Sequence, residues 1–340
     1  MVSEGVGRDD PRTARGTEVP RTGFEGNFAI NESAVAPVSG EPTAPVRSSA
    51  PGTLVGSIVQ GLRPRQWAKN VLVFAVPLAS GSIAQPRVLL AVLVAFVLFC
   101  LVSGGVYLIN DVRDADADRQ HPRKRFRPVA SGALPPRVAV AVAVVLLAGS
   151  LAAAVLLTRP ALAGVLGAYV AISVCYSLFL KDQPVIDLAV VASGFLLRGV
   201  AGGAAAGIAP SQWFLLVASF GALFIVAGKR YAEILAMGEG AGATRKSLVS
   251  YSASYLRFVW SMSAGVTCTV YCLWAFELRD ASGVPWTTIS IAPFVLGLLR
   301  YAVDVDRGTA GAPEDILLRD RFLVGIGVVW AVVFSLGVIN

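Results

Sequence analysis

The chain has 340 residues, of which 55% are hydrophobic and only 15% are charged, a balance that excludes an ordinary soluble domain of this length. Its net charge of +7 does not indicate nucleic-acid binding, because no basic globular domain remains once the apolar segments are set aside. The four cysteines lie in apolar runs without metal-ligand spacing, which argues against a zinc site or a disulfide framework. The composition therefore predicts an all-α integral membrane protein.

The first 52 residues differ from everything that follows them. They are rich in Gly, Pro, Ser, Thr and Glu, and they show no apolar periodicity. Such a segment buries too little apolar surface to fold, so we expect a disordered cytoplasmic tail at 1–52. Residues 53–340 then form one transmembrane domain.

Nine apolar segments follow the tail, each near the roughly 20 residues that cross the hydrocarbon core of a bilayer. Lys69, Asn70 and Pro77 interrupt the first segment, which leaves room for an interfacial helix that begins at Thr53. The nine predicted transmembrane helices lie at about 67–84, 88–111, 137–158, 161–181, 184–207, 213–235, 255–277, 287–304 and 320–340.

Basic residues are concentrated in alternate loops. The connections at 112–136 and 229–257 hold most of the arginines and lysines found between the predicted helices, and the opposite loops hold few. Cytoplasmic loops carry this excess of positive charge. We therefore expect a multi-pass plasma-membrane protein whose N-terminus and basic loops are cytoplasmic and whose C-terminus lies outside.

An acidic stretch, "NDVRDADAD", ends the second predicted span at residues 110–118. If the helix continues through this stretch, Asp111, Asp114 and Asp118 lie within about 60° of one another, and Asp116 points away. Carboxylates this close repel one another unless a cation lies between them, and hard oxygen ligands suit Mg²⁺ that bridges to a substrate diphosphate. The alternative is that these aspartates form solvated ion pairs with nearby arginines.

A second acidic cluster lies between the fourth and fifth predicted spans, where Lys181, Asp182 and Asp187 surround Pro184. A charged turn between helices explains Lys181 and Asp182 by itself. It explains Asp187 less well, because Pro184 is placed to open the next helix and Asp187 falls in its first turn.

Arg198 lies well inside a predicted span, where a bare guanidinium costs at least about 2.5 kcal/mol. It needs an acidic or phosphate partner that faces a cavity, and the alternative is a structural ion pair within the membrane. The small residues around it, including Gly199, Gly202 and Gly203, let helices approach closely or line that cavity.

At residues 54–340 the chain resembles the UbiA-type intramembrane prenyltransferase superfamily. Asn110, Asp111, Asp114 and Asp118 fit the first motif of that family, N-D-x-x-D-x-x-x-D. The second motif, D-x-x-x-D, is one residue longer here, from Asp182 to Asp187, which leaves the contribution of Asp182 open. The resemblance implies nine helices around a central cavity that opens to the cytoplasmic face and laterally to lipid. It also implies Mg²⁺ held by the first motif and a catalytic role for its three aspartates and for Asp187.

Five further stretches resemble an actinobacterial branch of that superfamily. Its members transfer 5-phosphoribose from phosphoribosyl pyrophosphate to polyprenyl (decaprenyl) phosphate and release pyrophosphate. The product serves the synthesis of the arabinose donor for cell-wall arabinan. The five stretches are "RPRQWAKN" at 63–70, "DRQHPRKRFRPVASG" at 118–132, "VAGKRYAE" at 226–233, "YLRFVWSMSA" at 255–264 and "PEDILLRDR" at 313–321.

Such a site holds two polyanions, which requires more cations than one diphosphate and one neutral ring would. Basic residues at the predicted cytoplasmic membrane edge supply them, although the positive-inside topology accounts for part of the set. The expected substrate-binding residues are Arg65, Lys69, Asn110, Lys124, Arg127, Lys181, Arg198, Lys229 and Arg230.

Two other functions remain open from the sequence. The first is transfer of a prenyl group from a prenyl diphosphate to an aromatic acceptor, in which the lipid itself leaves the diphosphate behind. The second is transport, with Arg198 and the acidic mouth as an ion pathway. No pair of broken helices in a repeat favours transport.

Overall fold

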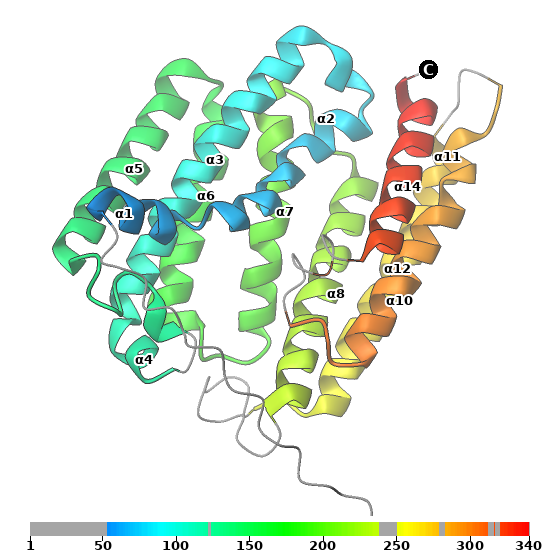
Figure 1. Cartoon of the computed structure of the whole chain (residues 1–340). Coiled ribbons are helices and arrows are strands. Elements are labelled where there is room, and N and C mark those ends of the chain that lie inside the picture. The colour runs from blue at the N-terminus through cyan, green and yellow to red at the C-terminus, as the bar shows by residue number, and fades with distance from the viewer. Residues whose placement is uncertain are drawn as a thin grey trace, which may run out of the picture. The chain divides into compact units, whose positions relative to one another are not determined.

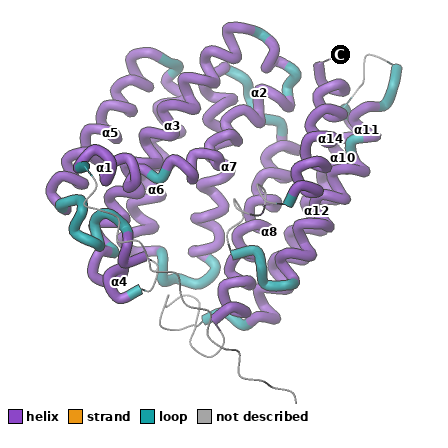
Figure 2. Tube along the Cα trace, in the orientation of Figure 1, coloured by secondary structure: helices purple, strands orange, loops and turns teal. Residues whose placement is uncertain are grey.

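The computed structural model describes residues 53–121, 124–237, 250–278, 283–311, 316 and 320–339. Within this part of the chain all regular structure is helical, as predicted (Figure 2). The predicted tail at 1–52 lies outside the described residues and remains a prediction. The elements are α1 (Leu54–Leu62), η1 (Pro64–Phe74), α2 (Ala75–Ala79), η2 (Ser82–Ala84), α3 (Pro86–Arg113), α4 (Ala115–Gln120), η3 (Lys124–Phe126), α5 (Pro136–Leu157), α6 (Pro160–Cys175), η4 (Tyr176–Leu180), α7 (Ile186–Ala206), α8 (Gln212–Met237), α10 (Ala253–Glu277), α11 (Trp286–Ile289), α12 (Ile291–Asp306) and α14 (Arg321–Ile339).

Eight helical segments of the described chain are long and apolar enough to cross a membrane. They correspond to the second through ninth predicted spans, with α6 continuing into η4 and α11 preceding α12. Pro86, Pro136 and Pro160 stand at the first positions of α3, α5 and α6, where the missing N–H costs no hydrogen bond.

The predicted first span, 67–84, is not a single helix, so the count of nine spans is not confirmed in the described residues. A 3₁₀ segment, η1, leads into the short helices α2 and η2. Figure 1 shows α1 and η1 running across the other helices, with α1 capped by Thr53, and the interfacial position of this start stays a prediction. Pro77 lacks an N–H and Asn70 is fully buried in a polar contact, and both features favour a broken backbone over a regular helix.

Helix α7 packs directly on this broken segment. A Cβ atom at Gly202 would lie 1.7 Å from the carbonyl oxygen of Val73, and one at Gly203 would lie 2.8 Å from Val76. No side chain fits at either position, so the small residues of α7 allow backbone contact with η1 and α2. Close approach, one of the two predicted uses of these glycines, is confirmed.

The apolar interior gathers around two sets of helices. One cluster includes Phe99, Leu162 and Leu166 from α3 and α6, and another includes Leu256 and Val305 from α10 and α12. Figure 1 shows α4 at the end of the bundle opposite to the C-terminus. The first acidic motif and the C-terminus therefore lie at opposite ends, as the predicted topology requires.

Candidate active site

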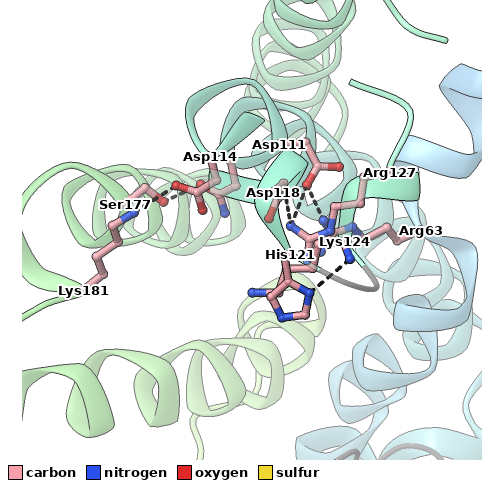
Figure 3. A network of polar contacts seen from close by, with 10 residues as sticks. Arg63, Asp111, Asp114, Asp118, His121, Lys124, Arg127, Ser177 and Lys181 are labelled. Atoms are coloured by element: carbon pink, nitrogen blue, oxygen red, sulfur yellow. Dashed lines mark hydrogen bonds and ion pairs between the residues drawn. The ribbon is translucent and has the colours of Figure 1, made fainter. Parts of the chain in front are cut away.

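The helix that carries the first acidic motif breaks within the motif. Helix α3 ends at Arg113, Asp114 takes a backbone conformation of φ −91° and ψ 6°, and α4 begins at Ala115. The expectation of a continuous helix through Asp118, with three carboxylates on one face, is therefore wrong. The break at Asp114 turns its side chain away from the other two aspartates (Figure 3).

Asp111 and Asp118 form a buried carboxylate pair bridged by arginine. Their exposed fractions are 1% and 4%. Arg127 Nη1 donates to Asp118 Oδ2 at 2.7 Å and to Asp111 Oδ1 at 3.3 Å. Arg63, from the junction of α1 and η1, also donates to Asp111 Oδ1 (Figure 3). The protein therefore places two of its own cations on two predicted metal ligands.

The chemistry of this pair fits a divalent cation, although the described residues contain no group of three or more His, Cys, Asp or Glu side chains close enough to hold a metal. Asp111 Oδ2 is buried and has no hydrogen-bond partner among the described residues. An unpaired buried carboxylate oxygen is costly unless a ligand satisfies it. Asp111 and Asp118 supply the hard oxygen donors that Mg²⁺ prefers.

A cavity of about 220 Å³ adjoins this oxygen-rich pair. The cavity places the carboxylate of Asp111 and both guanidinium groups beside open space, which is an arrangement suited to a phosphorylated ligand. Its lining residues are Gln60, Arg63, Asp111, Phe126, Arg127 and Pro128.

The other half of the first motif meets η4, a π-helical turn at the end of α6. Lys181 Nζ donates to Asp114 Oδ1 at 2.9 Å, and the Ser177 hydroxyl donates to Asn110 (Figure 3). Asp116 is 94% exposed and pairs only with Arg119 at the surface of the described chain. Asp116 therefore points away from the site, as predicted.

The second acidic cluster is closed. Asp187 is fully buried, and Arg230 reaches both of its oxygens, with Nε to Oδ2 at 3.0 Å and Nη2 to Oδ1 at 3.3 Å. The Tyr176 hydroxyl donates to Asp187 Oδ1 at 2.5 Å, and Arg230 Nη1 donates to Glu233 at 2.8 Å. This cluster joins η4, α7 and α8 through the buried carboxylate of Asp187.

The turn before Asp187 separates it from Asp182. Asp182 is exposed, and Val185 adopts a left-handed φ of 66°, which is strained for a β-branched residue. The Val185 N–H donates to the Tyr251 hydroxyl at 2.6 Å, and burial raises the pKa of that hydroxyl, which keeps it neutral. The longer spacing between Asp182 and Asp187 thus places only Asp187 inside the protein.

Arg198 is buried in the membrane region with neutral partners. Its Nε donates to Asn70 Oδ1 at 2.8 Å, its Nη1 to the Gly194 carbonyl at 2.6 Å and its Nη2 to the Tyr169 hydroxyl at 3.1 Å. The guanidinium also lies 5.1 Å from the ring centre of Phe99. No carboxylate among the described residues pairs with it, so the expected partner is not acidic in this part of the chain, and the phosphate alternative stays a prediction.

The remaining predicted binding residues lie on η1, η3 and α8. Arg65 is exposed on η1, and Lys69 lies half-buried on the same segment. The Lys124 N–H donates to His121 Nδ1 at 3.3 Å, and Lys229 Nζ lies 4.0 Å from Glu233. The described structure thus brings Arg127 and Lys181 to the first motif and Arg230 to the second.

Sequence reasoning missed several partners in these clusters. Arg63 stood among the basic residues of one quoted stretch, but no signal tied it to Asp111 across 48 positions. Glu233 follows Arg230 by three residues, which is a helical spacing that predicts their contact. Tyr169 and Tyr176 carried no signal, because each joins its arginine or aspartate through tertiary packing alone.

The UbiA prenyltransferase family model matches residues 71–326 of this sequence. The chain belongs to the UbiA prenyltransferase family. Among solved structures, this family member is similar to a UbiA homologue from Archaeoglobus fulgidus bound to DMAPP and Mg²⁺, with a TM-score of 0.64, 18% identity, and coverage of 83% of this chain and 99% of that one. At this identity the likeness shows the fold, which is that of the family.

Curated relatives lie much nearer in sequence. This family member is 51% identical over 289 residues to a decaprenyl-phosphate phosphoribosyltransferase of Mycobacterium tuberculosis, covering 84% of this chain and 95% of that protein. It is 49% identical over 285 residues to the protein of the same name from Corynebacterium glutamicum, covering 82% and 86% of the two chains. Both matches cover more than four-fifths of this chain.

Proposed function

We propose that this protein transfers the 5-phosphoribosyl group of phosphoribosyl pyrophosphate to a polyprenyl phosphate and releases pyrophosphate. The observation that carries this proposal is the identity of about half of all aligned residues with two phosphoribosyltransferases, over more than four-fifths of each chain. A lipid phosphate oxygen attacks the anomeric carbon of the ribose. The bond from that carbon to the pyrophosphate oxygen breaks, and pyrophosphate leaves with the electron pair.

The first motif is the proposed site of the leaving group. Asp111 and Asp118, with Asp114 from the adjoining break in the helix, hold Mg²⁺ in this proposal. When bound, Mg²⁺ supplies positive charge that stabilises the departing pyrophosphate. The unpaired Oδ2 of Asp111 and the adjoining cavity support the choice of this carboxylate.

Cations of the chain bind the phosphates around this centre. Arg127 and Lys181 already lie on the motif's carboxylates, and Arg63 borders the same cavity as Arg127. Guanidinium groups match phosphate oxygens with two parallel hydrogen bonds, whereas the ammonium of Lys181 acts as a point charge. Together they orient the pyrophosphate and neutralise its charge as the bond breaks.

The attacking group needs no strong base, because a lipid phosphate is ionised at neutral pH. This requirement agrees with a chain that contains a single histidine. His121 accepts the Lys124 N–H at Nδ1 and so orders the loop beside the first motif. Asp187 and Arg230 hold α7 and α8 in register behind the site in this proposal.

The proposed location is the plasma membrane, with the site on the cytoplasmic side, where phosphoribosyl pyrophosphate is available. The asymmetry of basic loops supports this orientation. It is checked by cysteine labelling from outside intact cells: a cysteine introduced at the C-terminus should react, and one introduced beside Asp116 should not.

Purified protein tests the reaction itself. Labelled phosphoribosyl pyrophosphate with polyprenyl phosphate should yield labelled lipid, whereas prenyl diphosphate with hydroxybenzoate should yield no prenylated ring. Prenylation of the aromatic acceptor without transfer of phosphoribose would overturn the proposal in favour of the aromatic reaction. Solute movement in proteoliposomes without turnover of either pair would favour transport.

A further inference from the structure

Two arginines form ion pairs with the carboxylates that are the proposed metal ligands. Arg127 Nη1 lies 2.7 Å from Asp118 Oδ2 and 3.3 Å from Asp111 Oδ1, and Arg63 donates to the same oxygen of Asp111. Two negative charges thus meet two positive charges in a place where the carboxylates are almost completely buried. The cluster is electrically balanced without any ion.

The same two arginines border the cavity. Both guanidinium groups contact Asp111 from one side and line the space of about 220 Å³ on the other, and their side chains are 27% and 28% exposed. A guanidinium has five N–H donors, so each can leave a carboxylate for an anion in the cavity with little movement. An arginine buried as deeply as Arg230, whose side chain is 5% exposed, cannot make this exchange.

Separate elements deliver these arginines. Arg63 ends α1 in a left-handed backbone conformation, with φ 53° and ψ 63°, and its guanidinium lies 5.1 Å from the ring centre of Tyr107. Arg127 follows η3, whose Phe126 also lines the cavity. A non-glycine residue in this conformation is strained, and the contacts with Asp111 and Tyr107 help to hold it there.

We infer that Arg63 and Arg127 are exchangeable cations: they neutralise Asp111 and Asp118 until a divalent cation takes the carboxylates, and they then bind the phosphates of the substrate. This inference rests on the proposed function for the position of the metal. It adds that metal and phosphorylated substrate bind cooperatively, because each alone leaves the cluster out of charge balance.

The charge balance predicts that binding of the metal and binding of the diphosphate favour each other. A divalent cation alone must displace two arginines, which then remain near it without partners, so its affinity is low. A diphosphate alone must draw the arginines away from two buried carboxylates, which then repel it. When both arrive, the metal satisfies the carboxylates and the phosphates satisfy the arginines, so each ligand raises the affinity for the other.

Replacement of Arg63 by glutamine separates the two effects, because it should change them in opposite directions. Isothermal titration of purified Arg63→Gln protein with Mg²⁺ alone should show binding at least about fivefold tighter than in the parent protein. Titration with the preformed Mg²⁺–pyrophosphate complex should show weaker binding than in the parent. A residue that only supports the fold would weaken both.

Arg119→Gln is the matched control, since Arg119 pairs with the exposed Asp116 on α4, the helix that carries Asp118, and the substitution should leave both affinities unchanged. Arg127→Gln provides a second test if the first variant fails to fold, and its affinity for Mg²⁺ alone should also rise. Unchanged or weaker binding of Mg²⁺ alone in the folded variants overturns the inference. The titrations use no ribosyl substrate, so opposite shifts in a protein that fails the transfer assay would keep the inference and reject the proposed function.

Discussion

The two acidic motifs hold their arginines in different surroundings. At the first, Arg63 and Arg127 lie about one-quarter exposed beside a cavity, and one oxygen of Asp111 lacks a partner. At the second, Arg230 is 5% exposed, and both oxygens of Asp187 accept hydrogen bonds. The contrast indicates that the first cluster can exchange its cations and that the second is fixed.

This difference favours different roles for the two motifs. A cluster with an unpaired oxygen and an adjoining cavity can accept a ligand while its arginines turn from the carboxylates toward the cavity. A closed cluster resists that exchange, because removal of either partner leaves an uncompensated charge in the interior. We therefore propose that metal and phosphate chemistry belongs to the first motif and that the second motif joins η4, α7 and α8 behind it.

The largest expected effect is on stability at the closed cluster. Asp187→Ala should lower the free energy of unfolding by about 3 kcal/mol, because Glu233 is then the one charged partner left to Arg230 among the described residues. Asp111→Ala should have a much smaller effect, since Arg63 and Arg127 can turn toward the cavity and water. Thermal unfolding of both variants in the same detergent measures this difference.

Equal losses of stability at the two positions would contradict the distinction between a closed and an exchangeable cluster. Asp116→Ala serves as the control for removal of an acidic group, because its side chain is 94% exposed. Its unfolding temperature should match that of the parent protein.

Activity should show the reverse order. Asparagine at Asp111, Asp114 or Asp118 keeps the side-chain volume but removes the charge that holds the proposed metal, so turnover should fall at least about a hundredfold. Asp116→Asn should remain near the parent value. The measurement is the rate of labelled lipid formation at saturating Mg²⁺, after membrane insertion has been verified.

The outcome at Asp114 is the most informative, because the break in the helix places it on Lys181 and apart from the other two aspartates. A normal rate for Asp114→Asn would restrict the metal to Asp111 and Asp118. Normal rates for all three variants would leave only ion pairs at this motif.

Arg198 offers a third kind of charged site, with neutral partners alone among the described residues. Arg198→Lys keeps the charge but cannot reach Asn70, Tyr169 and the Gly194 carbonyl together, so we expect a loss of about 2 kcal/mol in stability. The Michaelis constant for phosphoribosyl pyrophosphate should also rise, because Asn70 anchors η1, which carries Lys69.

A double-mutant cycle tests that anchoring role. If Arg198 acts on η1 through Asn70, then Asn70→Ala and Arg198→Lys should be less than additive in both stability and Michaelis constant. Additive effects would mean that Arg198 supports α7 independently of η1.

Hydropathy alone located eight spans, because eight helical segments carry long apolar runs whose lengths match the bilayer. It could not locate the broken path of η1 and α2, since that path depends on contact between Gly202 and Val73, more than a hundred residues apart. Likewise, the sequence predicted that Asp116 faces away but not the break at Asp114. Local periodicity assumes a straight helix, and the contact with Lys181 in η4 is tertiary.

The smallest expected effect concerns two lysines, one beside each acidic cluster. Lys181 lies 2.9 Å from Asp114 in the motif that we assign to the phosphates, whereas Lys229 lies 4.0 Å from Glu233 beside the closed cluster. Lys181→Ala should raise the Michaelis constant for phosphoribosyl pyrophosphate about tenfold, or about 1.4 kcal/mol for one lost phosphate contact, with a small change in kcat. Lys229→Ala should raise it less, because Glu233 already attracts its ammonium group. Steady-state kinetics on the two variants measures this difference. A larger increase in the Michaelis constant for Lys229→Ala would place a phosphate at the second cluster and reverse the roles proposed for the two motifs.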